Sequence, residues 1–87
     1  MSENVESVGT MVGVVKWFSF QRGYGHIICN IGGVDEDVFV HHNVLPGRKG
    51  SRMLQEHDTV TMEVSRHTSG DMVGKYFASS VLKVERQ

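Results

Sequence analysis

The 87-residue sequence predicts a small all-β domain: a five-stranded antiparallel barrel without an amphipathic helix. Ten glycines and one proline divide the chain into short segments, which is typical of short strands joined by tight turns. Several segments alternate apolar and polar residues with the period of a half-buried strand. A chain of this length forms one domain near the lower limit of what a single core stabilises. Closure into a barrel would remove its exposed strand edges.

The first two predicted strands are rich in β-branched and aromatic residues. They cover residues 12–20 and 23–30, and a turn signal with two glycines follows the second. We assign residues 1–10 to a flexible, polar N-terminal tail without an apolar signal core, and residues 11–85 to the domain.

The other three predicted strands cover residues 37–42, 59–66 and 75–84. Between them, residues 46–51 form a basic loop, and residues 52–57 form at most one helical turn. Alternation along each strand predicts which side chains fill the barrel. The predicted interior consists of Val12, Val14, Ile27, Val38, Val40, Leu54, Val60, Met62, Val64 and Val81.

The string Arg22-Gly23-Tyr24-Gly25-His26-Ile27 nearly fits the RNP1 pattern of RNA-binding domains. Its glycines leave one side of the strand flat, and its rings alternate onto the other side. Such a face is a platform for stacked bases, each worth roughly 1–3 kcal/mol. Phe39 and His41 place rings on the outer face of the next strand. The alternative is an ordinary amphipathic strand pair, which we disfavour because exposed rings cost solubility without a ligand.

The order of these strings resembles the cold-shock domain family of Y-box and bacterial cold-shock proteins. The resemblance runs through residues 13–18, 22–27 and 37–41, more weakly through 58–60 and 78–81. It implies an OB-fold barrel that binds single-stranded RNA or DNA with modest sequence preference. With the neighbouring basic and imidazole side chains, the predicted nucleic-acid-binding residues are Lys16, Trp17, Phe18, Arg22, Tyr24, His26, Phe39, His41, His42 and Arg52.

Trp17 and Phe18 are neighbours, so a straight strand places them on opposite faces. Both reach the ligand only if the first strand bends or bulges. Around the platform, Lys16 and Arg22 flank the rings, and the loop after the third strand is cationic through Arg48, Lys49 and Arg52.

Four residues depart from the family pattern. Ser19 stands where the family usually has Asn, His26 where it has Phe, His42 where it has Phe or Gln, and Ser51 where many relatives have an aromatic ring. These departures predict weaker or differently selective binding. Because imidazole ordinarily titrates near pH 6.5, mild acid is expected to add positive charge beside the phosphates. The alternative is that the imidazoles stay neutral as stacking rings.

Other classes of protein fit the sequence poorly. No stretch has the ~20 apolar residues of a membrane-spanning helix, so we expect no membrane partner. His26 and Cys29 point to opposite faces of a strand, and we predict no metal and no cofactor. Cys29 has no evident base beside it, so we expect it to be a buried side chain that fills space in the core and not a catalytic nucleophile. We therefore expect that the protein is not an enzyme. A single cysteine suits a reducing compartment, either the cytoplasm or, in a eukaryote, also the nucleus.

Three functions remain open. The first is an RNA chaperone-like monomer that binds single strands and regulates RNA structure, translation or stability. The second is a transcription regulator that binds single-stranded DNA, which stacking alone does not distinguish from RNA. The third is a protein-interaction module derived from the cold-shock fold, which the net charge of −1 and the apolar turn around Ile31 and Val34 favour.

Overall fold

The computed structural model describes residues 4–46 and 54–86. Within these ranges it contains five strands and one short 3-10 turn, which confirms the all-β, five-stranded prediction. The predicted residues Arg48, Lys49, Ser51 and Arg52 lie outside the described ranges. The elements are β1 (Val5–Ser19), β2 (Tyr24–Ile31), β3 (Val34–His41), η1 (His42–Val44), β4 (Thr59–His67) and β5 (Tyr76–Glu85).

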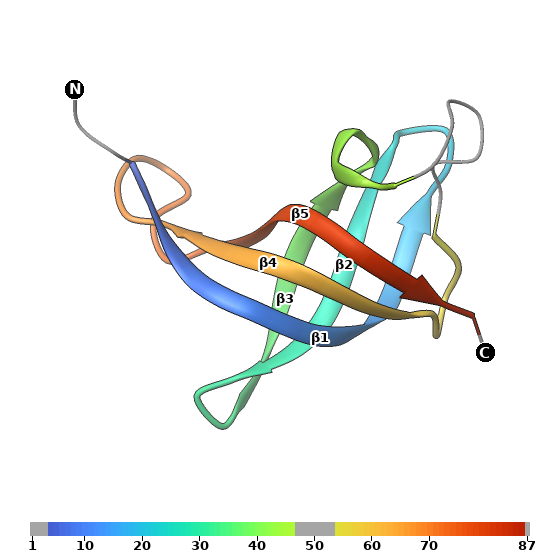
Figure 1. Ribbon diagram of the computed structural model, residues 1–87. Coiled ribbons are helices and arrows are strands. Elements are labelled where there is room, and N and C mark those ends of the chain that lie inside the picture. Colours follow the sequence, from blue (N-terminus) through green and yellow to red (C-terminus); the bar gives the residue numbers. More distant parts are fainter. Residues whose placement is uncertain (1–3, 47–53, 87) are drawn as a thin grey trace.

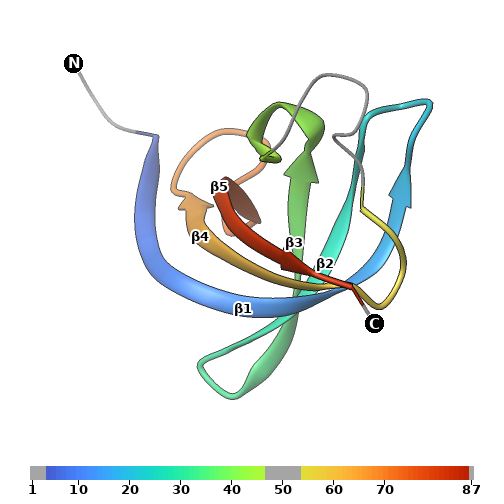
Figure 2. The same cartoon turned by 45° about the vertical axis from the view of Figure 1, so that its right-hand side comes forward.

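The strands close into a ring in the order β1-β2-β3-β5-β4 (Figure 1). The pairs β1–β2, β1–β4, β2–β3 and β4–β5 are antiparallel, as predicted. β3 and β5 close the ring through a short parallel pairing, in which Val38 lies opposite Tyr76 and Phe39 opposite Phe77. The long, curved β1 makes this closure possible, because it pairs with β4 along its first part and with β2 along its last part (Figure 2).

β1 begins at Val5, so the prediction of a flexible tail over residues 1–10 is wrong for residues 5–10. Residues 5–10 belong to the sheet and pair with the last part of β4. Gly9, with a φ of +133°, lies next to a register shift, and its freedom at positive φ lets the strand continue past this irregularity. The guanidinium of Arg66 also pairs with the carboxylate of Glu6 across the two strands.

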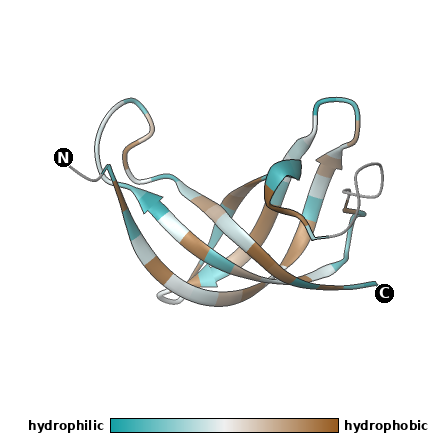
Figure 3. Cartoon of the chain, turned by 45° about the horizontal axis from the view of Figure 1, so that its top comes forward, coloured by the Kyte–Doolittle hydropathy of each residue, from teal (hydrophilic) through white to brown (hydrophobic). Residues whose placement is uncertain are grey.

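The core lies inside the ring, and apolar and polar residues alternate along the strands around it (Figure 3). Its members are Val15, Ile27, Cys29, Val38, Val40, Leu45, Leu54, Val60, Met62, Val64, Ala78 and Val81. The prediction that Val12 and Val14 lie in the barrel interior is wrong, because Val12 is 59% exposed and Val14 is 44% exposed. Gly13 and Val15 face inward instead. There is no room for a side chain at residue 13, since a Cβ there would lie 2.6 Å from Cγ2 of Ile27.

The side chain of Cys29 is buried in the core, as predicted. Its Sγ lies 3.8 Å from Sδ of Met11, and burial, with a smaller contribution from the charge of Asp35, raises the pKa of the thiol above its ordinary value. Because the thiolate is the reactive form, we expect iodoacetamide to alkylate the folded protein much more slowly than the urea-unfolded chain. Equal rates of alkylation, followed by mass spectrometry at mildly alkaline pH, would contradict this burial.

Candidate nucleic-acid interface

A bulge in β1 decides which of its side chains face outward. Val15 lies opposite Ile27 and Trp17 lies opposite His26, so Lys16 is the extra residue in β1. Val15 therefore stays in the core, while Lys16 is exposed and Trp17 is half-buried beside the outward-facing His26. The structure thus contains a bulge of the kind that the sequence required if Trp17 and Phe18 were both to reach the ligand.

The bulge brings Trp17, but not Phe18, to the outer face. Phe18 lies opposite Gly25, and its ring packs against the core while remaining partly exposed. A Cβ on Gly25 would lie 2.2 Å from the carbonyl oxygen of Trp17 and 2.9 Å from Cδ1 of Phe18. Gly25 therefore faces inward and allows β1 to approach β2 closely at this point.

Four rings form a continuous surface over β1, β2 and β3, which we call the ring face: Trp17, Tyr24, His26 and Phe39. The ring centroid of Trp17 lies 5.9 Å from Tyr24 and 5.0 Å from His26, and that of Phe39 lies 5.5 Å from Tyr24 and 6.3 Å from His26. Cross-strand register produces this arrangement, because Trp17, His26 and Phe39 lie opposite one another on three successive strands. All four are half-buried and lie outside the core set of the described residues.

Two further imidazoles lie at the end of the ring face. The rings of His41 and His42 are 4.5 Å apart, and His41 lies opposite Tyr24. Nδ1 of His41 accepts a hydrogen bond from the backbone N–H of Asn43, and the backbone N–H of His42 donates to the carbonyl of Gly23. Gly23 was predicted to flatten the strand, but it precedes β2 in a turn with a φ of +79°. A Cβ there would also lie 2.6 Å from the imidazole of His42.

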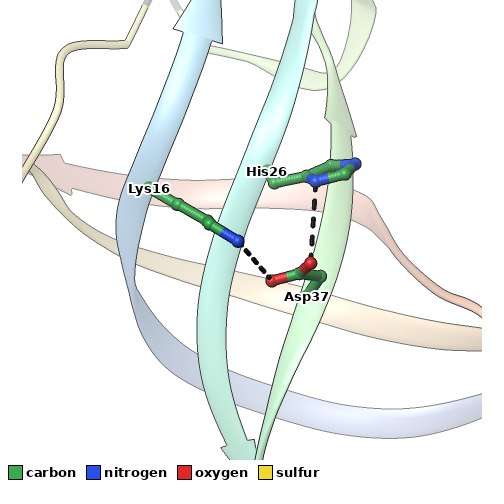
Figure 4. A network of polar contacts seen from close by, with 3 residues as sticks. All are labelled: Lys16, His26 and Asp37. Atoms are coloured by element: carbon green, nitrogen blue, oxygen red, sulfur yellow. Dashed lines mark ion pairs between the residues drawn. The ribbon is translucent and has the colours of Figure 1, made fainter.

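One carboxylate lies between two cationic or titratable groups at the edge of the ring face (Figure 4). Asp37 on β3 is 3.7 Å from Nζ of Lys16 on β1 and 3.9 Å from Nδ1 of His26 on β2. The side chains of Lys16 and Asp37 are each about half exposed, so this ion pair adds little to stability. A bound phosphate would compete with Asp37 for Lys16.

The turn between β1 and β2 places a cation next to the ring face and also carries an exposed ring. The guanidinium of Arg22 is 3.5 Å from the hydroxyl of Tyr24. Ser19 accepts a hydrogen bond from the backbone N–H of Arg22, so its hydroxyl stabilises the turn. Phe20 is 63% exposed in the same turn, and the sequence analysis did not assign it to the site.

Sequence reasoning also missed an aromatic pair on the neighbouring strands. Phe77 on β5 packs against His67 on β4, with ring centroids 4.6 Å apart and planes 34° apart. The two adjacent aromatic residues Tyr76 and Phe77 were the sequence feature that could have indicated this pair. Alternation alone, however, does not tell which of two neighbouring rings faces outward. Both Phe77 and His67 line a groove that begins at Phe39.

The described residues contain no group of three or more His, Cys, Asp or Glu side chains placed to hold a metal ion. Within the same ranges, no helix is long and apolar enough to cross a membrane. The surface itself presents rings, imidazoles and a few charges, which suit the non-covalent binding of planar groups.

Comparison with known proteins places most of the chain, including the strands that carry the ring face, in one family. Residues 11–75 match the family model of the "Cold-shock" DNA-binding domain. The chain is 45% identical over 58 residues to the cold shock-like protein CspA of Stigmatella aurantiaca, covering 67% of this chain and 81% of that protein. It is 41% identical over 59 residues to the major cold shock protein of Micrococcus luteus, covering 68% and 84%. Protein lin-28 of Caenorhabditis elegans is 38% identical over 58 residues, which are 67% of this chain but 24% of that protein.

Proposed function

The chain belongs to the cold-shock domain family, a non-enzymatic family that binds nucleic acids, and on this premise we propose that it holds single-stranded RNA or DNA by stacking bases on the ring face. The observation that carries the proposal is the set of four half-buried rings outside the core, spread over three adjacent strands. Each base stacked on such a ring contributes roughly 1–3 kcal/mol to binding.

The proposed mechanism is competition between stacking of bases on the protein and pairing of the same bases with one another. Bases that lie on Trp17, Tyr24 and Phe39 are separated from their pairing partners, so binding favours the unpaired form of a strand. A protein with this property acts as an RNA chaperone and thereby alters RNA structure, translation or stability. A ring recognises the plane of a base and not its sugar, so the same face accepts single-stranded DNA, as in a transcription regulator.

Trp17 provides a direct test, because it is the single tryptophan of the chain. We expect heptamers of RNA and DNA to quench its fluorescence to saturation at low salt, while a duplex of the same sequence quenches it weakly. The relative affinities of the two heptamers show which nucleic acid is preferred. If neither heptamer quenches Trp17 even at low salt, the proposed function is wrong.

A second candidate function is a protein-interaction module. Val34 is 57% exposed at the tip of the β2–β3 hairpin, and three successive acidic residues, Asp35 to Asp37, follow it. An apolar side chain beside an acidic run suits a basic protein partner better than a phosphate backbone. Absence of quenching by either heptamer would favour this function.

The imidazoles make binding dependent on pH. We expect affinity for a short single strand to rise from about pH 7.5 to about pH 6 at fixed salt, because protonated imidazoles attract phosphates. His26 faces Asp37 on β3 and Lys16 on β1, and Lys75 lines the same groove.

The matched control for this pH effect is His26→Phe, which keeps a ring but removes the imidazole. Its affinity should rise less on acidification than that of the unaltered protein. Fluorescence titrations at several pH values measure both, and circular dichroism checks that each protein remains folded. An affinity of the unaltered protein that is constant or falls towards pH 6 would refute the prediction.

A further inference from the structure

We propose that the groove over the β3–β5 pairing, which side chains of β2, β4 and the β4–β5 turn also line, is a second base-binding subsite, in which Phe77 and His67 receive one further nucleotide of the strand held by the ring face. This inference rests on the proposed function and extends its binding surface. The groove has a volume of about 430 Å³, within the range of small-ligand pockets. Its lining residues are His26, Asp37, Phe39, His67, Met72, Lys75, Tyr76 and Phe77.

The groove is continuous with the ring face through Phe39. Phe39 belongs to the ring face and also lines the groove. It lies opposite Phe77 in the parallel β3–β5 pairing, so both side chains project from the same outer surface of two adjacent strands. A strand stacked on Tyr24 and Phe39 can therefore continue across β3 onto Phe77 without leaving the surface.

Phe77 contributes its ring to the surface and not to the core. Its neighbour Tyr76 packs against the core, and the next residue, Ala78, is buried within it. Alternation along β5 therefore turns Phe77 outward, where its ring packs against that of His67. The residue of β4 directly opposite Phe77 is Ser65, and His67 is two residues further along the same strand. A half-buried phenylalanine in this position gives a flat apolar surface for a base, in the same way as Phe39.

The charges around the groove orient the backbone of such a strand. Lys75 is exposed and lines the groove, where it can meet a phosphate. The carboxylates of Asp35, Glu36 and Asp37 line an adjoining hollow together with Gly74, Lys75 and Tyr76. Lys75 lines both the groove and this acidic hollow, so it is the cation that offsets the repulsion between the carboxylates and a phosphate while the base enters the apolar groove.

The test is a series of single strands of increasing length, measured by fluorescence anisotropy of an end label. A trimer occupies the ring face alone, whereas a nonamer also reaches the groove. We expect Phe77→Ala to bind the trimer as the unaltered protein does but to bind the nonamer at least about fivefold more weakly, the loss of one stacked base. Phe77→Leu should show the same loss, and Phe77→Tyr should retain nonamer binding, because stacking needs a flat ring and not only an apolar side chain.

The outcomes separate the two proposals. If the unaltered protein binds neither oligomer, the proposed function fails and the subsite with it. If it binds both, and Phe77→Ala binds the nonamer equally well, the subsite alone is refuted. An equal loss for trimer and nonamer also refutes it, because the ring would then support the whole face and not one further nucleotide.

Discussion

Replacing Phe39 by alanine is expected to lower the affinity for a single-stranded heptamer by roughly 5- to 150-fold, the loss of at least one stacked base. Phe39 lies at the centre of the proposed interface, with its ring 5.5 Å from Tyr24 and 6.3 Å from His26, and it also lines the groove towards Phe77. Removing it interrupts the surface between β2 and β5. The variant keeps Trp17, so the same fluorescence titration measures the unaltered and the altered protein.

The control for Phe39→Ala is an apolar truncation elsewhere on the surface. Leu82 on β5 is 53% exposed and does not line the groove, so Leu82→Ala should bind like the unaltered protein. Phe39→Ala also loses the ring contacts with Tyr24 and His26, so its urea midpoint should fall, and binding is compared under conditions in which circular dichroism shows both proteins folded. A Phe39→Ala protein that folds and binds with unchanged affinity would show that bases do not stack at this position.

Replacing Gly25 by alanine is expected to destabilise the fold by about 3 kcal/mol, the upper end of the usual range for overpacking. The added methyl group would lie 2.2 Å from the carbonyl oxygen of Trp17 and 2.7 Å from Cα of Phe18. Both contacts are with backbone atoms of β1, so no side-chain rotation relieves them. The strands must separate where the bulge positions Trp17, and we expect nucleic-acid binding to fall with stability.

Gly33→Ala is the matched control for this clash. Gly33 has a φ of +90° and nothing within 4 Å of an added Cβ, so its substitution carries only the backbone penalty of roughly 1–2 kcal/mol. Urea unfolding followed by circular dichroism compares the free energies of unfolding of the two variants. If Gly25→Ala were no less stable than Gly33→Ala, the close approach of β1 to β2 would not be real.

The rings of β2 and β3 were predictable because strict alternation determines their direction. Val38 and Val40 are plainly apolar, so Phe39 between them must face outward, and the paired β2 follows the same rule. In β1 the rule failed. Val12 and Val14 suggested that the even-numbered residues face inward, whereas the structure places Gly13 and Val15 on the inner face. The core position at residue 13 is filled from other strands, which a local pattern does not reveal.

The aromatic pair on β4 and β5 was not predictable for a related reason. The direction of Phe77 depends on its pairing with β3 and β4, which are distant in the sequence. Tyr76 and Phe77 are adjacent and both aromatic, so alternation of polarity carries no information there. The start of β1 at Val5 likewise depends on β4, since residues 5–10 are mostly polar and gain their structure from cross-strand pairing.

The central claim is that single strands bind to the ring face, and mapping of amide and indole chemical shifts by NMR during titration with an unlabelled heptamer tests it most directly. The predicted result is that the largest changes occur at the indole of Trp17 and along Tyr24, His26 and Phe39, while Val12 and the other exposed residues of the β1–β4 surface stay unchanged. No shift changes at saturating heptamer, or changes concentrated on the β1–β4 surface, would contradict the claim.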